Sequence, residues 1–317
     1  MAIEIGPGWT IGGGITVSSP PSAPTVATAG WFVGGTGGGA GITTVNRVTF
    51  ANDTATASVR GPLSVALNGG AGTGNTTYGW FGGSSLSSVY QSTVQRITYA
   101  TDSATASVRG PLSTARGYLA ATGNTTDGWF ADGFGSISIV DRITYASDTA
   151  TASVRGPLNL GVYALAATGD STNGWFGGGS GTSAIQRITY ATDTATGTIR
   201  GALSGTIRGL AASTDSTTYG WFGGGYQTIA PVWASLVQRI TYATDTAAVS
   251  VRGPLSAGRF YLAACGNTTD GWFGSGYTPA AVSLIDRITY ATDTATASVR
   301  GPLSLSTYYL SAAAGTQ

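Results

Sequence analysis

Few kinds of chemically reactive side chain occur in this chain. Its 317 residues include fifteen arginines, thirteen aspartates, Glu4 and a single cysteine, Cys265, but no lysine and no histidine. The sequence therefore lacks an imidazole base, a histidine metal ligand and a Schiff-base lysine, and one cysteine forms neither an intrachain disulfide nor a thiolate zinc site. We expect a protein that is not an enzyme and has no catalytic residue, no cofactor and no metal site.

The arginines and aspartates recur in a fixed pattern, best seen in QRITYATDTATASVRGPLS. Each of six copies has two arginines 13 residues apart with an aspartate between them: Arg47, Asp53, Arg60; Arg96, Asp102, Arg109; Arg142, Asp148, Arg155; Arg187, Asp193, Arg200; Arg239, Asp245, Arg252; and Arg287, Asp293, Arg300. One function rarely needs six copies, so we interpret these groups as a ring of ion pairs or backbone hydrogen bonds between units.

A Trp-Phe pair precedes each copy, and the repeat that it opens sets the architecture. The tryptophans are Trp31, Trp80, Trp129, Trp175, Trp221 and Trp272. One unit divides into YLAATG, a polar turn, GWFGGG, a loop, VQRITYA, a tight ATDT turn and ATASVRG, which are four short strands rich in β-forming residues. No segment has a helical apolar period. Neighbouring Trp and Phe side chains point to opposite sides of a strand, so we expect them to pack against the two adjacent units.

Six units of four strands predict an all-β, six-bladed β-propeller over residues 24–317. The first unit lacks its leading strand, because PSAPTVATAG precedes Trp31, whereas the chain ends in YYLSAAAGTQ. We therefore expect the C-terminal segment to supply the innermost strand of the first blade and to close the ring without a free edge. Cys265 falls where other units have Thr122 and Thr168, which predicts a small core strand residue.

The order of these motifs resembles the kelch repeat, whose blades form β-propellers. The resemblance covers residues 24–317, and it departs in detail: here Trp precedes the glycines, and Val-Arg-Gly stands in the fourth strand. The repeat of the regulator of chromosome condensation is a weaker match. Such a resemblance implies a scaffold and leaves the function open.

The first residues, GPGWTIGGGITV followed by SSPPSAP, resemble short Gly-rich leaders on virion proteins of tailed bacteriophages. Low charge and Ser/Thr/Gly/Ala richness are similar to phage decoration and fibre proteins. This resemblance implies that residues 1–23 are an anchoring segment with a Pro-rich linker, in which Ile5, Trp9, Ile11 and Ile15 contact other virion proteins. A poorly ordered tail is the alternative. The resemblance implies localisation in the virion, and because the segment lacks the features of a secretory signal, we expect synthesis in the host cytoplasm.

A binding surface is expected on the loops between the second and third strands, where all the length variation lies. Non-repeated aromatic residues fall in these loops: Tyr90, Phe134, Tyr226, Trp233 and Tyr277. The connection from the fourth strand to the next unit opens on the same side and carries the three arginines outside the hairpin: Arg116, Arg208 and Arg259. They either bind a ligand with the aromatic residues or bond loop carbonyls.

The leading hypothesis is a non-enzymatic phage virion structural protein, either a capsid decoration or a tail-fibre component, that presents a propeller face to a host surface glycan or a protein. Two alternatives remain: a lectin-like or glycan-cleaving bacterial propeller, and a purely structural spacer. The net charge is +1, with no basic run and no long apolar stretch, so we expect neither a nucleic-acid partner nor membrane insertion.

Overall fold

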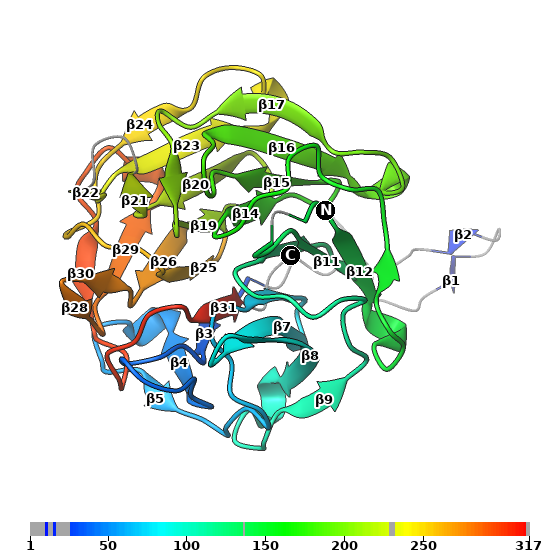
Figure 1. The fold of residues 1–317 in the computed structure, drawn as a ribbon, viewed down its shortest axis with the longest axis horizontal. Helices are drawn as coiled ribbons and strands as arrows, with labels where there is room; N and C mark the ends of the chain where they lie inside the picture. Colours follow the sequence, from blue (N-terminus) through cyan, green and yellow to red (C-terminus); the bar gives the residue numbers. More distant parts are fainter. Residues whose placement is uncertain (1–9, 12–14, 17–25, 136, 228–231, 315–317) are drawn as a thin grey trace.

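The computed structural model describes residues 10–11, 15–16, 26–135, 137–227 and 232–314. These residues form antiparallel strands and short 3₁₀ turns around a central axis (Figure 1). Six sheets have four strands each. The prediction of an all-β chain built from repeated four-stranded sheets is confirmed. Within the described part of the chain, no helix has the length and apolar character needed to cross a membrane.

Each sheet runs from an innermost strand near the axis to an outermost strand at the rim, with every neighbouring pair antiparallel. The innermost strands are β31 (Ser311–Ala314), β6 (Ala71–Gly74), β10 (Ala120–Gly123), β14 (Ala166–Gly169), β19 (Ala211–Thr214) and β25 (Ala263–Gly266). The second strands are β3 (Ala29–Val33), β7 (Tyr78–Leu86), β11 (Asp127–Ala131), β15 (Asn173–Gly177), β20 (Tyr219–Gly223) and β26 (Asp270–Gly274). In this order they belong to the first to the sixth sheet.

The outer half of each sheet is the predicted Arg-containing hairpin. The third strands are β4 (Val45–Thr49), β8 (Val89–Thr98), β12 (Val140–Thr144), β16 (Ala184–Thr189), β23 (Val237–Thr241) and β29 (Ile285–Thr289). The outermost strands are β5 (Ser58–Val59), β9 (Ser107–Arg109), β13 (Ser153–Val154), β17 (Thr198–Ala202), β24 (Ser250–Arg252) and β30 (Ser298–Arg300). Between them lie the 3₁₀ turns η1 (Phe50–Asn52), η2 (Tyr99–Thr101), η3 (Tyr145–Ser147), η4 (Tyr190–Thr192), η5 (Tyr242–Thr244) and η6 (Tyr290–Thr292).

The outermost strands are shorter than the sequence predicted, because the Ala-Thr-Ala stretch before them pairs with a neighbouring sheet instead. The backbone N–H of Ala106 donates to the carbonyl of Pro62 at 2.9 Å, and Ala152 donates to Pro111 at 2.8 Å. This stretch therefore joins adjacent sheets at the rim.

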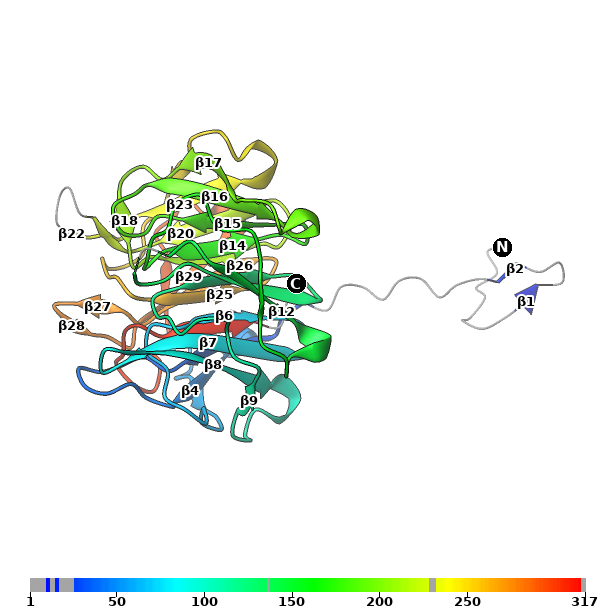
Figure 2. The same cartoon turned by 45° about the vertical axis from the view of Figure 1, so that its right-hand side comes forward.

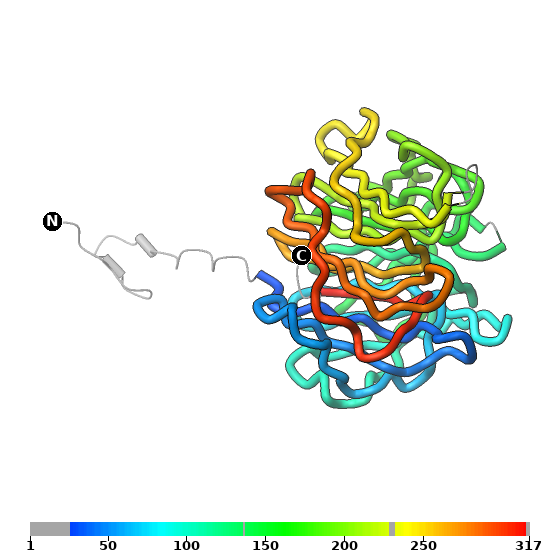
Figure 3. The backbone as a smooth tube through the Cα atoms, turned by 90° about the vertical axis from the view of Figure 1, so that its left-hand side faces the viewer, coloured from blue at the N-terminus to red at the C-terminus, as the bar shows by residue number. Residues whose placement is uncertain are grey.

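The C-terminal strand completes the sheet that contains the first Trp-Phe pair, as the sequence predicted. Strand β31 pairs antiparallel with β3, with Trp31 opposite Ala313. Figure 3 shows this segment in red among segments from the start of the chain in blue. Strand β31 also contacts β6 on one side and β25 on the other, so contacts between innermost strands run continuously around the axis.

Side chains of adjacent sheets interlock through the Trp-Phe pair, as the strand alternation predicted. Trp31 of the first sheet shares a core cluster with Phe81 and Tyr99 of the second sheet. The Trp31 ring stacks on Tyr99 with ring centroids 3.9 Å apart. The sixth sheet meets the first in the same way, because Trp272 stacks on Phe50 at 3.7 Å. The core therefore lies between the sheets.

Five shorter strands lie on one side of the disc, which we call the variable-loop face. They are β18 (Ile207–Arg208), β21 (Tyr226–Gln227) and β22 (Val232–Trp233), which form one sheet, and β27 (Tyr277–Thr278) and β28 (Ala280–Ala281), which form another. Figure 2 shows β22, β27 and β28 projecting from this side. The opposite side, which we call the turn face, holds the turns between first and second strands and the 3₁₀ turns.

Candidate functional site

The repeated arginines and aspartates join adjacent sheets. In every sheet the indole N–H of the repeated Trp donates to the aspartate of the following sheet, and both repeated arginines approach the same carboxylate. The Trp–Asp pairs are Trp31–Asp102, Trp80–Asp148, Trp129–Asp193, Trp175–Asp245, Trp221–Asp293 and Trp272–Asp53, at 2.8–2.9 Å. Ion pairs such as Arg96–Asp148 at 3.0 Å and Arg109–Asp148 at 3.5 Å accompany them. The predicted ring of ion pairs is confirmed, and its function is structural.

The five loop aromatics that the sequence singled out lie on the variable-loop face. Tyr90 is in the β7–β8 hairpin, Tyr226 and Trp233 pair across β21 and β22, and Tyr277 is in β27. Phe134 follows β11 and is 46% exposed, and Trp233 is 38% exposed. Large exposed aromatic side chains offer rigid contact area to a partner.

These side chains belong to one larger aromatic network, and the sequence reasoning missed the other half of it. The missed members come from the connections between fourth and first strands: Tyr118, Tyr163, Phe260, Tyr261, Tyr308 and Tyr309. Tyr90 meets Phe134 at 5.7 Å, Tyr118 joins Phe134 to Tyr309, and Tyr261 lies 3.9 Å from Tyr309. Phe260 and Tyr277 extend the network to Trp233. In the sequence, these aromatic residues stand two or three positions before the innermost strands of the first, third, fourth and sixth sheets.

A ring of backbone hydrogen bonds supports this network at the axis. One residue from each sheet has a left-handed φ and donates its N–H to the carbonyl of the equivalent residue in the preceding sheet. The members are Gly69 (φ 66°), Tyr118 (60°), Ala164 (57°), Gly209 (64°), Tyr261 (56°) and Tyr309 (61°), with N–O distances of 2.5–2.9 Å. A left-handed φ is strained for a non-glycine residue, and such strain persists where surrounding contacts hold it. The ring closes the axis beneath Tyr118, Tyr261 and Tyr309.

The prediction that Arg116 and Arg259 belong to the binding surface is wrong, because both side chains are fully buried. Arg116 pairs with Asp141 at 2.8 Å and donates to the carbonyl of Phe130 at 3.1 Å. Arg259 pairs with Asp286 at 2.8 Å and donates to the Ser275 carbonyl. These guanidinium groups therefore bond loop carbonyls and a buried carboxylate, which was the alternative interpretation, and neither reaches the surface.

A signal for this burial was present in the sequence. The residue before the first repeated arginine is Asp141 or Asp286 in these two repeats only, and it is Asn46, Gln95, Gln186 or Gln238 in the others. Every one of these side chains accepts a hydrogen bond from the backbone of its fourth-to-first connection, as Gln238 does from Ser204 at 2.6 Å. The aspartate adds a buried negative charge, which requires a buried cation. Where the amide occurs in the fifth sheet, fully buried Ile207 takes the place of Arg116.

Arg208 lies one position further along its connection, on the surface of the aromatic network. Its guanidinium lies 5.4 Å from the Tyr226 ring, and its Nη1 is 3.4 Å from the Tyr163 hydroxyl. Among the described residues it is the one arginine without a carboxylate within 4.0 Å, and its buried Nε has no hydrogen-bond partner there. Arg208 therefore keeps the predicted placement beside the loop aromatics.

Burial shifts the acids of this region toward their neutral forms. It raises the pKa of both Tyr261 and Tyr309, so these phenols stay protonated. It also raises the pKa of Asp132, a fully buried residue near Arg116, to about 8 against the opposing effects of a Val162 hydrogen bond and the Arg116 charge. Arg208 is half-buried, and its guanidinium lies between the Tyr226 ring and the Tyr163 hydroxyl.

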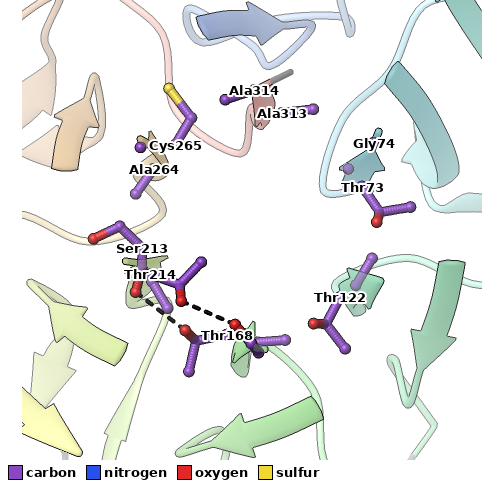
Figure 4. A pocket seen from close by; sticks show the side chains of 16 residues that line it. Thr73, Gly74, Thr122, Thr168, Ser213, Thr214, Ala264, Cys265, Ala313 and Ala314 are labelled. Carbon is purple, nitrogen blue, oxygen red and sulfur yellow. Dashed lines mark hydrogen bonds between the residues drawn. The ribbon is translucent and has the colours of Figure 1, made fainter. Parts of the chain in front are cut away.

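The axis itself holds two small cavities. One, of about 80 Å³, lies at the backbone ring and is lined by residues such as Tyr118, Tyr261 and Tyr309. The other, of about 90 Å³, lies toward the turn face, where Figure 4 shows Thr73, Thr122, Thr168, Ser213 and Cys265 around it. Cys265 is a buried core residue, as predicted, and burial raises its pKa. No group of three potential metal ligands gathers in the described residues.

Two of the predicted anchoring residues can be placed. Ile11 in β1 (Thr10–Ile11) pairs with Ile15 in β2 (Ile15–Thr16), which form a two-stranded sheet of their own. Ile5 and Trp9 lie outside the described residues.

Comparison with known proteins supports the propeller class. No family model matches the chain, and no curated protein matches it. Among solved structures, one titled "Structure of YjhT" is similar with a TM-score of 0.63 at 10% sequence identity, covering 79% of this chain and 88% of that one. At this identity the similarity concerns the fold alone. The repeated four-stranded sheets around an axis and this match define a β-propeller.

Proposed function

We propose that this chain is a non-enzymatic virion structural protein of a tailed bacteriophage, a capsid decoration or tail-fibre component, whose variable-loop face binds a host surface glycan. The fold in this proposal is a closed six-bladed propeller of kelch-like type, in which β31 completes the first blade. The resemblance of residues 1–23 to virion leaders supports the phage part of the proposal. The aromatic network supports the binding part.

The observation that carries the binding part is a contrast between the non-repeated loops and the connections between fourth and first strands. Trp233 and Phe134 are exposed on non-repeated loops, while the connection tyrosines beneath them are held by the backbone ring. Aromatic faces stack on sugar rings and cost little side-chain entropy on binding. Arg208 adds a fixed fork of hydrogen-bond donors beside Tyr163 and Tyr226.

A glycan array tests this proposal with the full chain and a matched pair of variants. Trp233→Ala removes an exposed ring of the network, and Val299→Ala removes a 56%-exposed side chain from the rim strand β30. We expect specific retention that W233A lowers at least ten-fold and V299A leaves unchanged. A blank array with the full chain would instead favour a structural spacer.

The anchoring part is tested separately by deleting residues 2–23. The truncated protein should keep its glycan binding and fail to join particles when it competes with the full chain during assembly. Particles that incorporate it as efficiently as the full chain would refute the anchor.

A further inference from the structure

In four of the six sheets, the residue two positions before the repeated Trp contacts the first repeated arginine, and in the fourth sheet Asn173 at this position accepts a hydrogen bond from Thr189. This position lies opposite the last Thr of the third strand and holds Tyr78, Asp127, Asn173, Tyr219 and Asp270. The Tyr78 and Tyr219 rings each lie 4.2 Å from the guanidinium of their sheet, and the two aspartates each approach an arginine Nε at 3.6 Å. The repeat therefore shows which groups this location accepts.

The first sheet has Ala29 at this position, opposite Thr49, and a cavity of about 380 Å³ lies there. We call it the first-sheet notch. It is lined by Trp31 and Arg47 of the first sheet and by Thr76 and Tyr99 of the second, with Val26 among its other wall residues. Trp31 is 5% exposed, whereas the other five repeated tryptophans are at most 1% exposed. The Arg47 side chain is 30% exposed, more than any other first arginine.

The walls of the notch favour a flat ring over an isolated acid. Indole and phenol groups of Trp31 and Tyr99 and the methyl groups of Val26 and Ala29 surround the space, which exceeds the volume of a carboxylate several-fold. Arg47 already has Asp102 at 3.4 Å. In the second sheet the corresponding ring meets both groups, because Tyr78 lies over Arg96 and edge-on to Trp80 at 5.5 Å. A ring in the notch would make the same cation–π and edge contacts.

We propose that the first-sheet notch binds an aromatic side chain of a partner protein that packs on the turn face. The ring takes the place that Tyr78 and Tyr219 occupy in their own sheets, over the Arg47 guanidinium and against the Trp31 edge. The notch opens on the turn face, since Thr76 and Ala100 belong to a first-to-second turn and a 3₁₀ turn. This interaction does not depend on the proposed glycan binding, which uses the opposite side.

The test titrates the full chain with p-cresol, the side-chain analogue of tyrosine, and follows the ligand by saturation-transfer difference NMR. We expect a dissociation constant on the order of 1 mM, as small aromatic molecules give in partly apolar cavities. Ala29→Tyr fills the notch with the ring that the second sheet has, so it should weaken this binding at least ten-fold. Val154→Ala, which changes a 59%-exposed side chain of β13 at the rim of the third sheet, should leave it unchanged.

A gain-of-site variant keeps the proposal falsifiable if A29Y does not fold. Tyr219→Ala opens the equivalent space over Arg239 in the fifth sheet, so it should add a second p-cresol site of similar affinity. Equal binding by folded A29Y, or no added binding in Y219A, would overturn the proposal. Displacement of p-cresol by equimolar acetate would also overturn it, because the notch would then be a carboxylate site.

Discussion

The layer between the sheets and the variable-loop face use the same residue types for opposite purposes. Between sheets, tryptophan, tyrosine and arginine occur at equivalent positions with almost the same distances: five of the six stacked pairs have centroids 3.7–3.9 Å apart, and Trp175–Tyr242 is at 4.1 Å. On the variable-loop face the aromatic centroids are 3.9–6.5 Å apart, and their planes meet at angles from 29° to 83°. The repeated groups join the sheets, and the exposed aromatic residues that do not repeat are the candidate binding groups.

Replacing one tryptophan from each region should give the largest difference in the free energy of unfolding. Trp129→Ala deletes a side chain that is 1% exposed and donates to Asp193, so it should lower the free energy of unfolding by about 3–5 kcal/mol. Trp233→Ala should change it by less than about 0.5 kcal/mol. Urea unfolding followed by circular dichroism measures both values. Equal losses would mean that Trp233 supports the fold.

The pH dependence of stability tests a departure from the repeat that lies inside the core. Asp132 stands where other sheets have Gly or Ser275, and burial raises its pKa from 3.8 to about 8. Above pH 4 the unfolded chain loses this proton while the folded chain keeps it. The stabilising contribution is therefore complete below pH 4 and is lost as pH rises through 8, at about 1.4 kcal/mol per unit between these values.

Asp132→Asn should remove this slope, because an amide does not titrate. Thermal unfolding of the two proteins at pH 5, 6, 7 and 8 measures the difference. Parallel curves for D132N and the unmodified chain would show that Asp132 is ionised in the folded protein.

The sequence predicted the regular part of the molecule well, because each regular element repeats a local pattern with a direct physical meaning. Alternation placed Trp and Phe on opposite sides of one strand, and the missing first strand placed Ala313 beside Trp31. Burial on the variable-loop face was harder to predict. Arg116 and Arg208 occupy neighbouring positions of equivalent connections, yet one is buried and one faces the aromatic network. That difference depends on Asp141, which is distant in sequence.

The contribution of the inter-sheet ion pairs to stability can be compared with that of an aspartate in a polar turn on the turn face. Asp193→Asn removes the charge that Arg142 and Arg155 share, and the arginines are 27% and 20% exposed, so water offsets part of the loss. We expect a loss of about 2 kcal/mol in urea unfolding.

The control is Asp215→Asn, at a position where the second, third and sixth repeats have asparagine. Its Oδ1 accepts backbone N–H groups of Thr217 and Thr218 at 2.8–2.9 Å, and an amide oxygen accepts them equally well. The change should stay below about 0.5 kcal/mol. A similar loss in both variants would show that carboxylate charge matters little between the sheets.

The smallest expected effect is a gain in stability, at a position where one repeat lacks a hydrogen bond that other repeats have. In the second, third and fourth sheets a Thr hydroxyl of the innermost strand bonds the tyrosine of the next sheet, as Thr73 does with Tyr145 at 3.0 Å. The equivalent residue beside Tyr99 is Ala313, and the buried Tyr99 hydroxyl has no hydrogen-bond partner among the described residues. Figure 4 shows Ala313 at this position near the axis.

Ala313→Thr should therefore raise the free energy of unfolding by about 1 kcal/mol, the usual net value of one buried hydrogen bond. Ala313→Val, which has the same shape without the hydroxyl, separates the bond from the added methyl groups. In the sixth sheet, Cys265 occupies the equivalent position. It packs in one core cluster with Phe50, which has no hydroxyl group that needs a hydrogen-bond partner. If A313V stabilises the protein as much as A313T does, the gain comes from packing, and the unbonded Tyr99 hydroxyl costs little.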